Sequence, residues 1–246
     1  MDEDKLIKAF KETLIELNDK YVKDLDHKIG ESKFYGRKKS HLFLGRSPSK
    51  SSYFENLLAG KISKVFKGYD FFVDFPLTFE GNKKTTLYTD IMVIAKPLEK
   101  SKCPKLCAII ELKTDLGYLK MDEGAKTKRK NREKMFKKSK AEFNLIPGDY
   151  YGNKEDGNKK IQIEIKNDLK KIFVVATLKN QHNVIDEKGN QIQKYIPYKK
   201  EMEKNGYDTI FLLDKNTYIG KRNINPEIEK AIKDNRKDII NAFKGL

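Results

Sequence analysis

Two apolar runs in the middle of the chain decide its fold: TTLYTDIMVIA at residues 85–95 and LCAIIEL at residues 106–112. Both are rich in β-branched and other apolar residues, which is typical of strands packed in a core. Residues 96–105, between them, contain two prolines, and this suits a connection between antiparallel strands. A third run, residues 69–77, is rich in Phe and Val and comes before them. We therefore expect three neighbouring strands.

Helical patterns precede these strands. Apolar residues recur every three or four positions in residues 4–25, which predicts an amphipathic helix. Residues 30–50 are polar and basic, with glycine and proline between the charges, and we interpret them as a linker. A second amphipathic helix is predicted to begin near Ser52 and to end at Gly68.

The second half of the chain continues the alternation of helices and strands. Residues 122–143 predict a long charged helix, and the continuous apolar run at residues 171–178 predicts a strand buried on both faces. Further along we expect a hairpin at 184–196, a helix at 198–205, a strand at 208–213 and a final helix with Asn225 as its N-cap and Pro226 in its first turn.

This order of elements describes an α/β protein in which a mixed β-sheet is flanked by helices. We expect residues 1–50 to form an N-terminal helix and basic linker, and residues 51–246 to form one domain.

The chain is strongly basic. It has 246 residues, of which 52 are Lys or Arg and 36 are Asp or Glu, so its formal net charge is +16. Nucleic acid is the leading partner, because cations that neutralise phosphates release counterions. The alternative is a charged surface that only keeps the protein soluble. No run approaches the ~18 apolar residues of a transmembrane helix, and the acidic start is unlike a secretory signal. We expect a cytoplasmic protein that does not enter membranes.

Asp90, Glu111 and Lys113 are the residues that point to chemistry. Asp90 lies inside an apolar run, where a charge is costly unless it is paired or binds a metal. Glu111 and Lys113 are two positions apart, so on a strand they point to the same face. Two carboxylates suit Mg²⁺, and the carbonyl of Leu112 could also face the metal. A metal-bound water and a lysine that orients or deprotonates it suit phosphodiester hydrolysis.

The spacing of Asp90 and Glu111-Leu112-Lys113 resembles the motif of the PD-(D/E)XK nuclease superfamily, which includes many restriction endonucleases. The resemblance covers about residues 52–178 and implies a restriction-endonuclease-like core, with one helix, three strands, a helix and a strand. It also implies DNA cleavage that depends on Mg²⁺, with Mn²⁺ as a substitute.

Two further positions bear on this resemblance. The family often places a glutamate in the helix before the first strand, and Glu55 stands there, which implies a supporting catalytic role. Thr89 stands where many members have a proline.

Each of these residues also has a purely structural interpretation. Asp90 can be a strand-end residue or the partner of a buried lysine, and Glu111 with Lys113 can form a surface ion pair. Glu55 fits a capping box that begins at Ser52.

The segment from Lys126 to Lys140 holds nine Lys or Arg residues and a single acid. On a helix, Lys126, Lys130, Lys134 and either Lys137 or Lys138 fall along one side, and DNA phosphates would offset their repulsion. These candidate DNA-binding residues are Lys126, Lys130, Lys134, Lys137 and Lys138. A solvated helix face is the alternative interpretation.

The sequence thus favours a metal-dependent DNA endonuclease, of the restriction or defence kind, acting on double-stranded DNA. A homodimer would suit the cutting of both strands. The alternatives are a non-catalytic nucleic-acid-binding protein on the same fold, and an interaction protein whose charge serves solubility.

Overall fold

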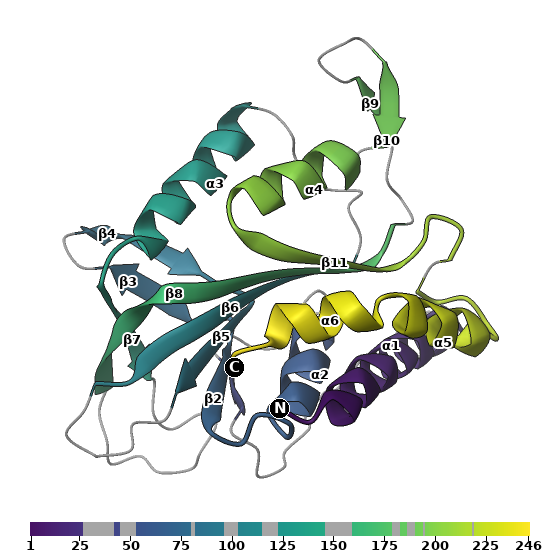
Figure 1. The fold of residues 1–246 in the computed structure, drawn as a ribbon, viewed down its shortest axis with the longest axis horizontal. Coiled ribbons are helices and arrows are strands. Elements are labelled where there is room, and N and C mark those ends of the chain that lie inside the picture. The colour runs from purple at the N-terminus through teal and green to yellow at the C-terminus, as the bar shows by residue number, and fades with distance from the viewer. Residues whose placement is uncertain are drawn as a thin grey trace.

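The computed structural model describes residues 1–26, 42–44, 53–79, 82–95, 103–114, 123–145, 159–178, 183–185, 190–193, 195–217 and 219–246. Within them, a nine-stranded mixed sheet is covered by helices on both faces (Figure 1). The expected α/β fold with a mixed sheet flanked by helices is therefore confirmed. None of the helices described there is long and apolar enough to cross a membrane.

The centre of the sheet follows the expected order. Three strands are antiparallel neighbours: β2 (Tyr69–Val73), β5 (Ile91–Ala95) and β6 (Lys105–Lys113). The next strand, β8 (Lys159–Thr177), is parallel to β6, and helix α3 (Glu123–Phe136) lies between them in the chain. A parallel pair needs such a crossover, and a helix usually supplies it.

Strand β8 is long enough to have two neighbours along one edge. Its first half pairs with β7 (Lys140–Leu145), and its second half pairs in parallel with β11 (Tyr207–Leu213). The hairpin of β3 (Pro76–Phe79) and β4 (Asn82–Tyr88) joins the sheet through β7. At the other edge, β1 (Leu42–Leu44) lies along β2.

Helices cover the two faces unequally. One face packs against α1 (Glu3–Asp26), α2 (Tyr53–Ile62), α5 (Asn225–Asp234) and α6 (Arg236–Phe243). Phe10 of α1 meets Phe243 of α6 edge-on, with ring centroids 5.7 Å apart, so the two ends of the chain share one core. The other face packs against α3 and α4 (Tyr195–Lys204). The predicted hairpin is present as β9 (Asn183–Ile185) and β10 (Gln191–Gln193), outside the main sheet.

Five of the expected elements differ in their bounds. The runs at 69–77 and 85–95 are each divided by a bend, so Asp90 precedes β5 rather than lying inside a strand. The helix predicted for 122–143 ends at Phe136, because β7 follows with Ala141 and Phe143 buried at every second position.

The second and last helices also differ. Helix α2 ends at Ile62, and turns continue to Gly68. The final helix has Ile224, not Asn225, as its N-cap, and it is divided at Asn235 into α5 and α6. Most of the linker predicted at 30–50 lies outside the described residues.

Candidate active site

Asp90 stands at a corner of the sheet. The chain bends at Asp74 between β2 and β3, and at Thr89 and Asp90 between β4 and β5. The backbone φ of Asp74 is 58°, a left-handed conformation that aspartate tolerates better than most residues. Because Ile91 of β5 pairs with Ile110 of β6, the corner places Asp90 beside the last residues of β6.

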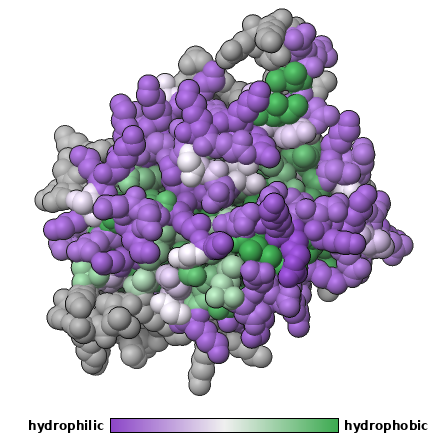
Figure 2. Space-filling view, in the orientation of Figure 1, coloured by the Kyte–Doolittle hydropathy of each residue, from purple (hydrophilic) through white to green (hydrophobic). Residues whose placement is uncertain are grey.

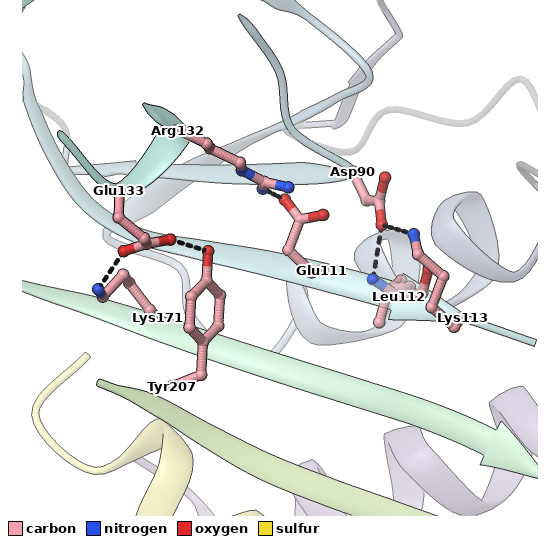
Figure 3. Close-up of polar contacts among 8 residues, drawn as sticks. All are labelled: Asp90, Glu111, Leu112, Lys113, Arg132, Glu133, Lys171 and Tyr207. Carbon is pink, nitrogen blue, oxygen red and sulfur yellow. Dashed lines mark hydrogen bonds and ion pairs between the residues drawn. The ribbon is translucent and has the colours of Figure 1, made fainter. Parts of the chain in front are cut away.

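The carboxylate of Asp90 binds the end of β6 directly. Its Oδ2 accepts hydrogen bonds from the backbone N–H of Leu112 at 2.6 Å and from Nζ of Lys113 at 3.1 Å (Figure 3). Lys113 Nζ also donates to the carbonyl of Leu112 at 2.8 Å. The two charged side chains are 21% and 33% exposed, for Asp90 and Lys113 respectively, so this pair lies at the surface end of a buried strand.

The protonation state of Lys113 follows from these contacts. Burial alone would lower the pKa of Lys113, but Asp90, with smaller contributions from Tyr198 and Glu55, raises that pKa above its ordinary value. Lys113 is therefore a cation at neutral pH.

Glu111 points to the same side of β6 as Lys113, but its ion-pair partner is a different residue. Its side chain is only 6% exposed, and it forms an ion pair with Arg132 of α3. Figure 3 shows the Glu111 carboxylate between Arg132 and Asp90. A carboxylate buried to this degree needs a counter-ion, and Arg132 supplies it.

Glu55 also reaches this end of the sheet. It lies in the first turn of α2, and its charge helps to raise the pKa of Lys113. The helix α2 that carries it packs against the opposite face from α3. Ser52, on which the capping-box interpretation depends, lies outside the described residues.

The donors at this site are chemically suited to Mg²⁺. Two carboxylates, Asp90 and Glu111, and the carbonyl of Leu112 are hard oxygen ligands, and Mg²⁺ often takes one or two carboxylates and keeps several waters. No cluster of three or more His, Cys, Asp or Glu side chains able to hold a metal occurs among the residues that the structure describes.

The lysines predicted to bind DNA divide between two elements. Lys126, Lys130 and Lys134 are exposed on α3, and Figure 2 shows a hydrophilic surface over this helix. Lys137 and Lys138 are also exposed, but they lie in the turn after the helix, so the expected continuation of the helical stripe to Lys137 or Lys138 is wrong.

The inner side of α3 carries a set of ion pairs that sequence reasoning missed. Arg129 binds Glu201 of α4 through two contacts of 2.6 and 3.0 Å, and Glu133 accepts from Lys171 at 2.6 Å and from the Tyr207 hydroxyl at 2.9 Å. Helical spacing was the signal that could have found them. Arg129, Arg132 and Glu133 lie on the same side of α3 as the buried Phe136.

Comparison with known proteins finds no matching family model, no matching curated protein and no matching solved structure.

Proposed function

We propose that this protein is a metal-dependent DNA endonuclease with a restriction-endonuclease-like fold. The observation that carries the proposal is the contact of Asp90 with Leu112 and Lys113 at 2.6 and 3.1 Å, next to Glu111. The element order supports the same fold. The elements α2, β2, β5, β6, α3 and β8 occur in this order as a helix, three strands, a helix and a strand parallel to the third, with the β3–β4 hairpin inserted after β2 and β7 inserted before β8.

The chain provides groups for each task in phosphodiester hydrolysis. Asp90, Glu111 and the Leu112 carbonyl would hold Mg²⁺ or Mn²⁺, which when bound supplies a water of lowered pKa and positive charge beside the phosphate. Lys113 would orient the attacking water or help to deprotonate it, and would stabilise negative charge on the phosphate. Glu55 would support Lys113 from α2.

The proposed substrate is double-stranded DNA. The formal charge of +16 and the exposed Lys126, Lys130 and Lys134 support binding to phosphates. A homodimer would cut both strands, and a cytoplasmic restriction or defence role agrees with such an activity.

Plasmid cleavage in Mg²⁺ tests the proposal. Asp90→Ala and Lys113→Ala should each lower the cleavage rate about 100-fold or more. Lys105→Ala is the matched control, because Lys105 lies at the opposite end of the same strand with its side chain 57% exposed. Wild-type cleavage by both site variants would remove the assigned roles.

One observation favours a second function, a non-catalytic nucleic-acid-binding protein on the same fold. Both carboxylates already have cationic partners within the chain, Asp90 with Lys113 and Glu111 with Arg132. Titration calorimetry with Mn²⁺ separates the two functions. Absence of Mn²⁺ binding, both with and without DNA, supports the non-catalytic function.

A further inference from the structure

The ion pair between Glu111 of β6 and Arg132 of α3 has no role in the function proposed so far. The side chain of Glu111 is 6% exposed and that of Arg132 is 21% exposed, so both charges are largely removed from water. Breaking such a pair without replacing either partner is strongly unfavourable. Arg132 therefore needs another anion whenever Glu111 binds a different cation.

The two acids that the structure describes on the inner side of α3 and on α4 beside it already have other partners. Glu201 forms a bidentate ion pair with Arg129, and Glu133 binds Lys171 and Tyr207. The Nε of Arg132 is buried and has no hydrogen-bond acceptor among the described residues. The guanidinium thus retains donor capacity that no acid on the inner side of α3 uses.

The charge at the site shows which anion fits. Asp90 and Glu111 together balance Lys113 and Arg132, so the four side chains have no formal net charge. A divalent cation added to this group leaves an excess of two positive charges, which DNA phosphates can offset. A planar guanidinium also matches two oxygens of one phosphate, as it matches a carboxylate.

We propose that Arg132 is a phosphate-binding residue of the active site, which binds Glu111 in the free protein and a DNA phosphate when Glu111 binds the divalent cation. This inference rests on the proposed endonuclease function. It makes Arg132 a competitor of the metal in the absence of DNA and a ligand of the substrate in its presence.

Arg129 provides a closely matched control. It lies one turn earlier on the inner side of α3, its side chain is 17% exposed, and it pairs with Glu201, which is not a proposed metal ligand. Each arginine also lies over an aromatic ring, Arg129 over Tyr198 at 5.3 Å and Arg132 over Phe136 at 5.7 Å. Replacement of either by methionine removes the same charge at similar burial.

The first measurement is titration calorimetry with Mn²⁺ alone, without DNA. Arg132→Met should bind Mn²⁺ about tenfold more tightly than wild type. An adjacent arginine typically lowers the pKa of a carboxyl group by about one unit or more, because it competes with the proton for the carboxylate, and it should compete with the metal in the same way. Arg129→Met should bind Mn²⁺ as wild type does. Unchanged or weaker binding by Arg132→Met would overturn the inference.

The second measurement is the single-turnover rate of plasmid cleavage. Arg132→Met should cleave about 100-fold more slowly despite its tighter metal binding. Arg132→Lys keeps the positive charge, so it should retain the Mn²⁺ affinity of wild type. It cannot donate two parallel hydrogen bonds to a phosphate, so it should cleave about tenfold more slowly. Cleavage at the wild-type rate by either Arg132 variant contradicts the inference.

Thermal unfolding of each variant identifies loss of fold. If Arg132→Met does not fold, Arg132→Lys decides the question by its cleavage rate. If wild type and Arg129→Met bind no Mn²⁺, with or without DNA, the proposed function fails and the inference fails with it. If wild type binds Mn²⁺ and cleaves DNA, and the Arg132 variants do so equally well, only the inference fails.

Discussion

The backbone N–H of Asp74 donates a hydrogen bond to the backbone carbonyl of Asp90 over 3.0 Å. Asp74 is the bend between β2 and β3, and Asp90 belongs to the bend between β4 and β5. The hydrogen bond therefore joins two corners of the chain, at the point where the β3–β4 hairpin leaves the central strands. It holds Asp90 beside the end of β6, where the Asp90 carboxylate meets Leu112 and Lys113.

Asp74→Ala should disturb this corner. Alanine is unfavourable at a φ of 58°, and Asp74 is buried, so we expect a loss of about 1–3 kcal/mol in the free energy of unfolding, measured with urea. Plasmid cleavage should slow as well, because Asp90 loses its support.

Asn223→Ala is the control for the effect on the backbone. Asn223 has a φ of 59°, is exposed, and precedes α5 on the face of the sheet opposite to α3. The Asn223→Ala variant should lose stability but cleave plasmid DNA at the wild-type rate. Equal cleavage by the two variants would show that the Asp74 corner does not position Asp90.

Glu133 should be the most costly residue to remove from the inner side of α3. Its side chain is 13% exposed and binds Lys171, which is 17% exposed, so Glu133→Ala leaves a largely buried cation without its carboxylate. We expect a loss of about 3–5 kcal/mol in the free energy of unfolding, measured with urea. Tyr207→Phe removes only a hydroxyl donor to Glu133 and should cost about 1 kcal/mol.

An exposed ion pair provides the comparison. Asp4 pairs with Arg236, and their side chains are 89% and 44% exposed, so Asp4→Ala should cost less than about 0.5 kcal/mol. A loss for Glu133→Ala as small as that for Asp4→Ala would mean that the inner ion pairs do not hold α3 on the sheet.

The protein should lose stability in alkaline solution. Burial raises the pKa of Tyr207 above its ordinary value of 10.0, and Asp90 raises the pKa of Lys113 above 10.5 despite the opposing effect of burial. Both groups hold their protons more tightly when folded, so their contribution is complete below about pH 10 and is lost as the pH rises through the folded pKa values.

Urea unfolding between pH 8 and pH 11.5 measures this loss. Tyr207→Phe should reduce the alkaline slope by up to about 1.4 kcal/mol per pH unit, because one proton no longer contributes. Tyr88→Phe, at a position that is 47% exposed, is the control for a lost hydroxyl. An identical slope in Tyr207→Phe and wild type would contradict the prediction.

The lysines of α3 should set the salt dependence of DNA binding. In the double variant Lys130→Ala/Lys134→Ala, the slope of log affinity against log salt concentration should fall by about 1.8, since each phosphate contact contributes about 0.9. Fluorescence anisotropy with a labelled duplex measures this slope. Lys230→Ala/Lys233→Ala on α5 removes two exposed lysines from the other face and should not change it. Equal slopes in the two double variants would place the DNA elsewhere.

Much of the central fold was predictable because its signals are local. The apolar runs of β5 and β6 and the two-residue spacing of Glu111 and Lys113 depend only on the alternation of side chains along a strand. The structure brings Asp90 and Lys113 within 3.1 Å of each other, and their roles in metal binding and catalysis stay predictions. The metal and the cleavage reaction stay predictions.

The errors arose where neighbouring chain segments share a composition. Residues 140–145 follow a lysine-rich helix, and their alternation was too short to distinguish from its continuation, so β7 was missed. The bends at Asp74 and Asp90 interrupt apolar runs that look continuous, because a left-handed residue and a long-range hydrogen bond leave no periodic signal.

By itself the sequence determined which residues form strands at the centre of the sheet and which carry charge there, because backbone geometry imposes those periods on every chain. Only the tertiary structure decided which cation belongs to which acid. Lys113 and Arg132 looked equivalent as charges, yet one pairs with Asp90 and the other with Glu111. That choice depends on how α3 packs on the sheet, because Arg132 and Glu111 are far apart in the chain and only the fold brings their side chains within ion-pair distance.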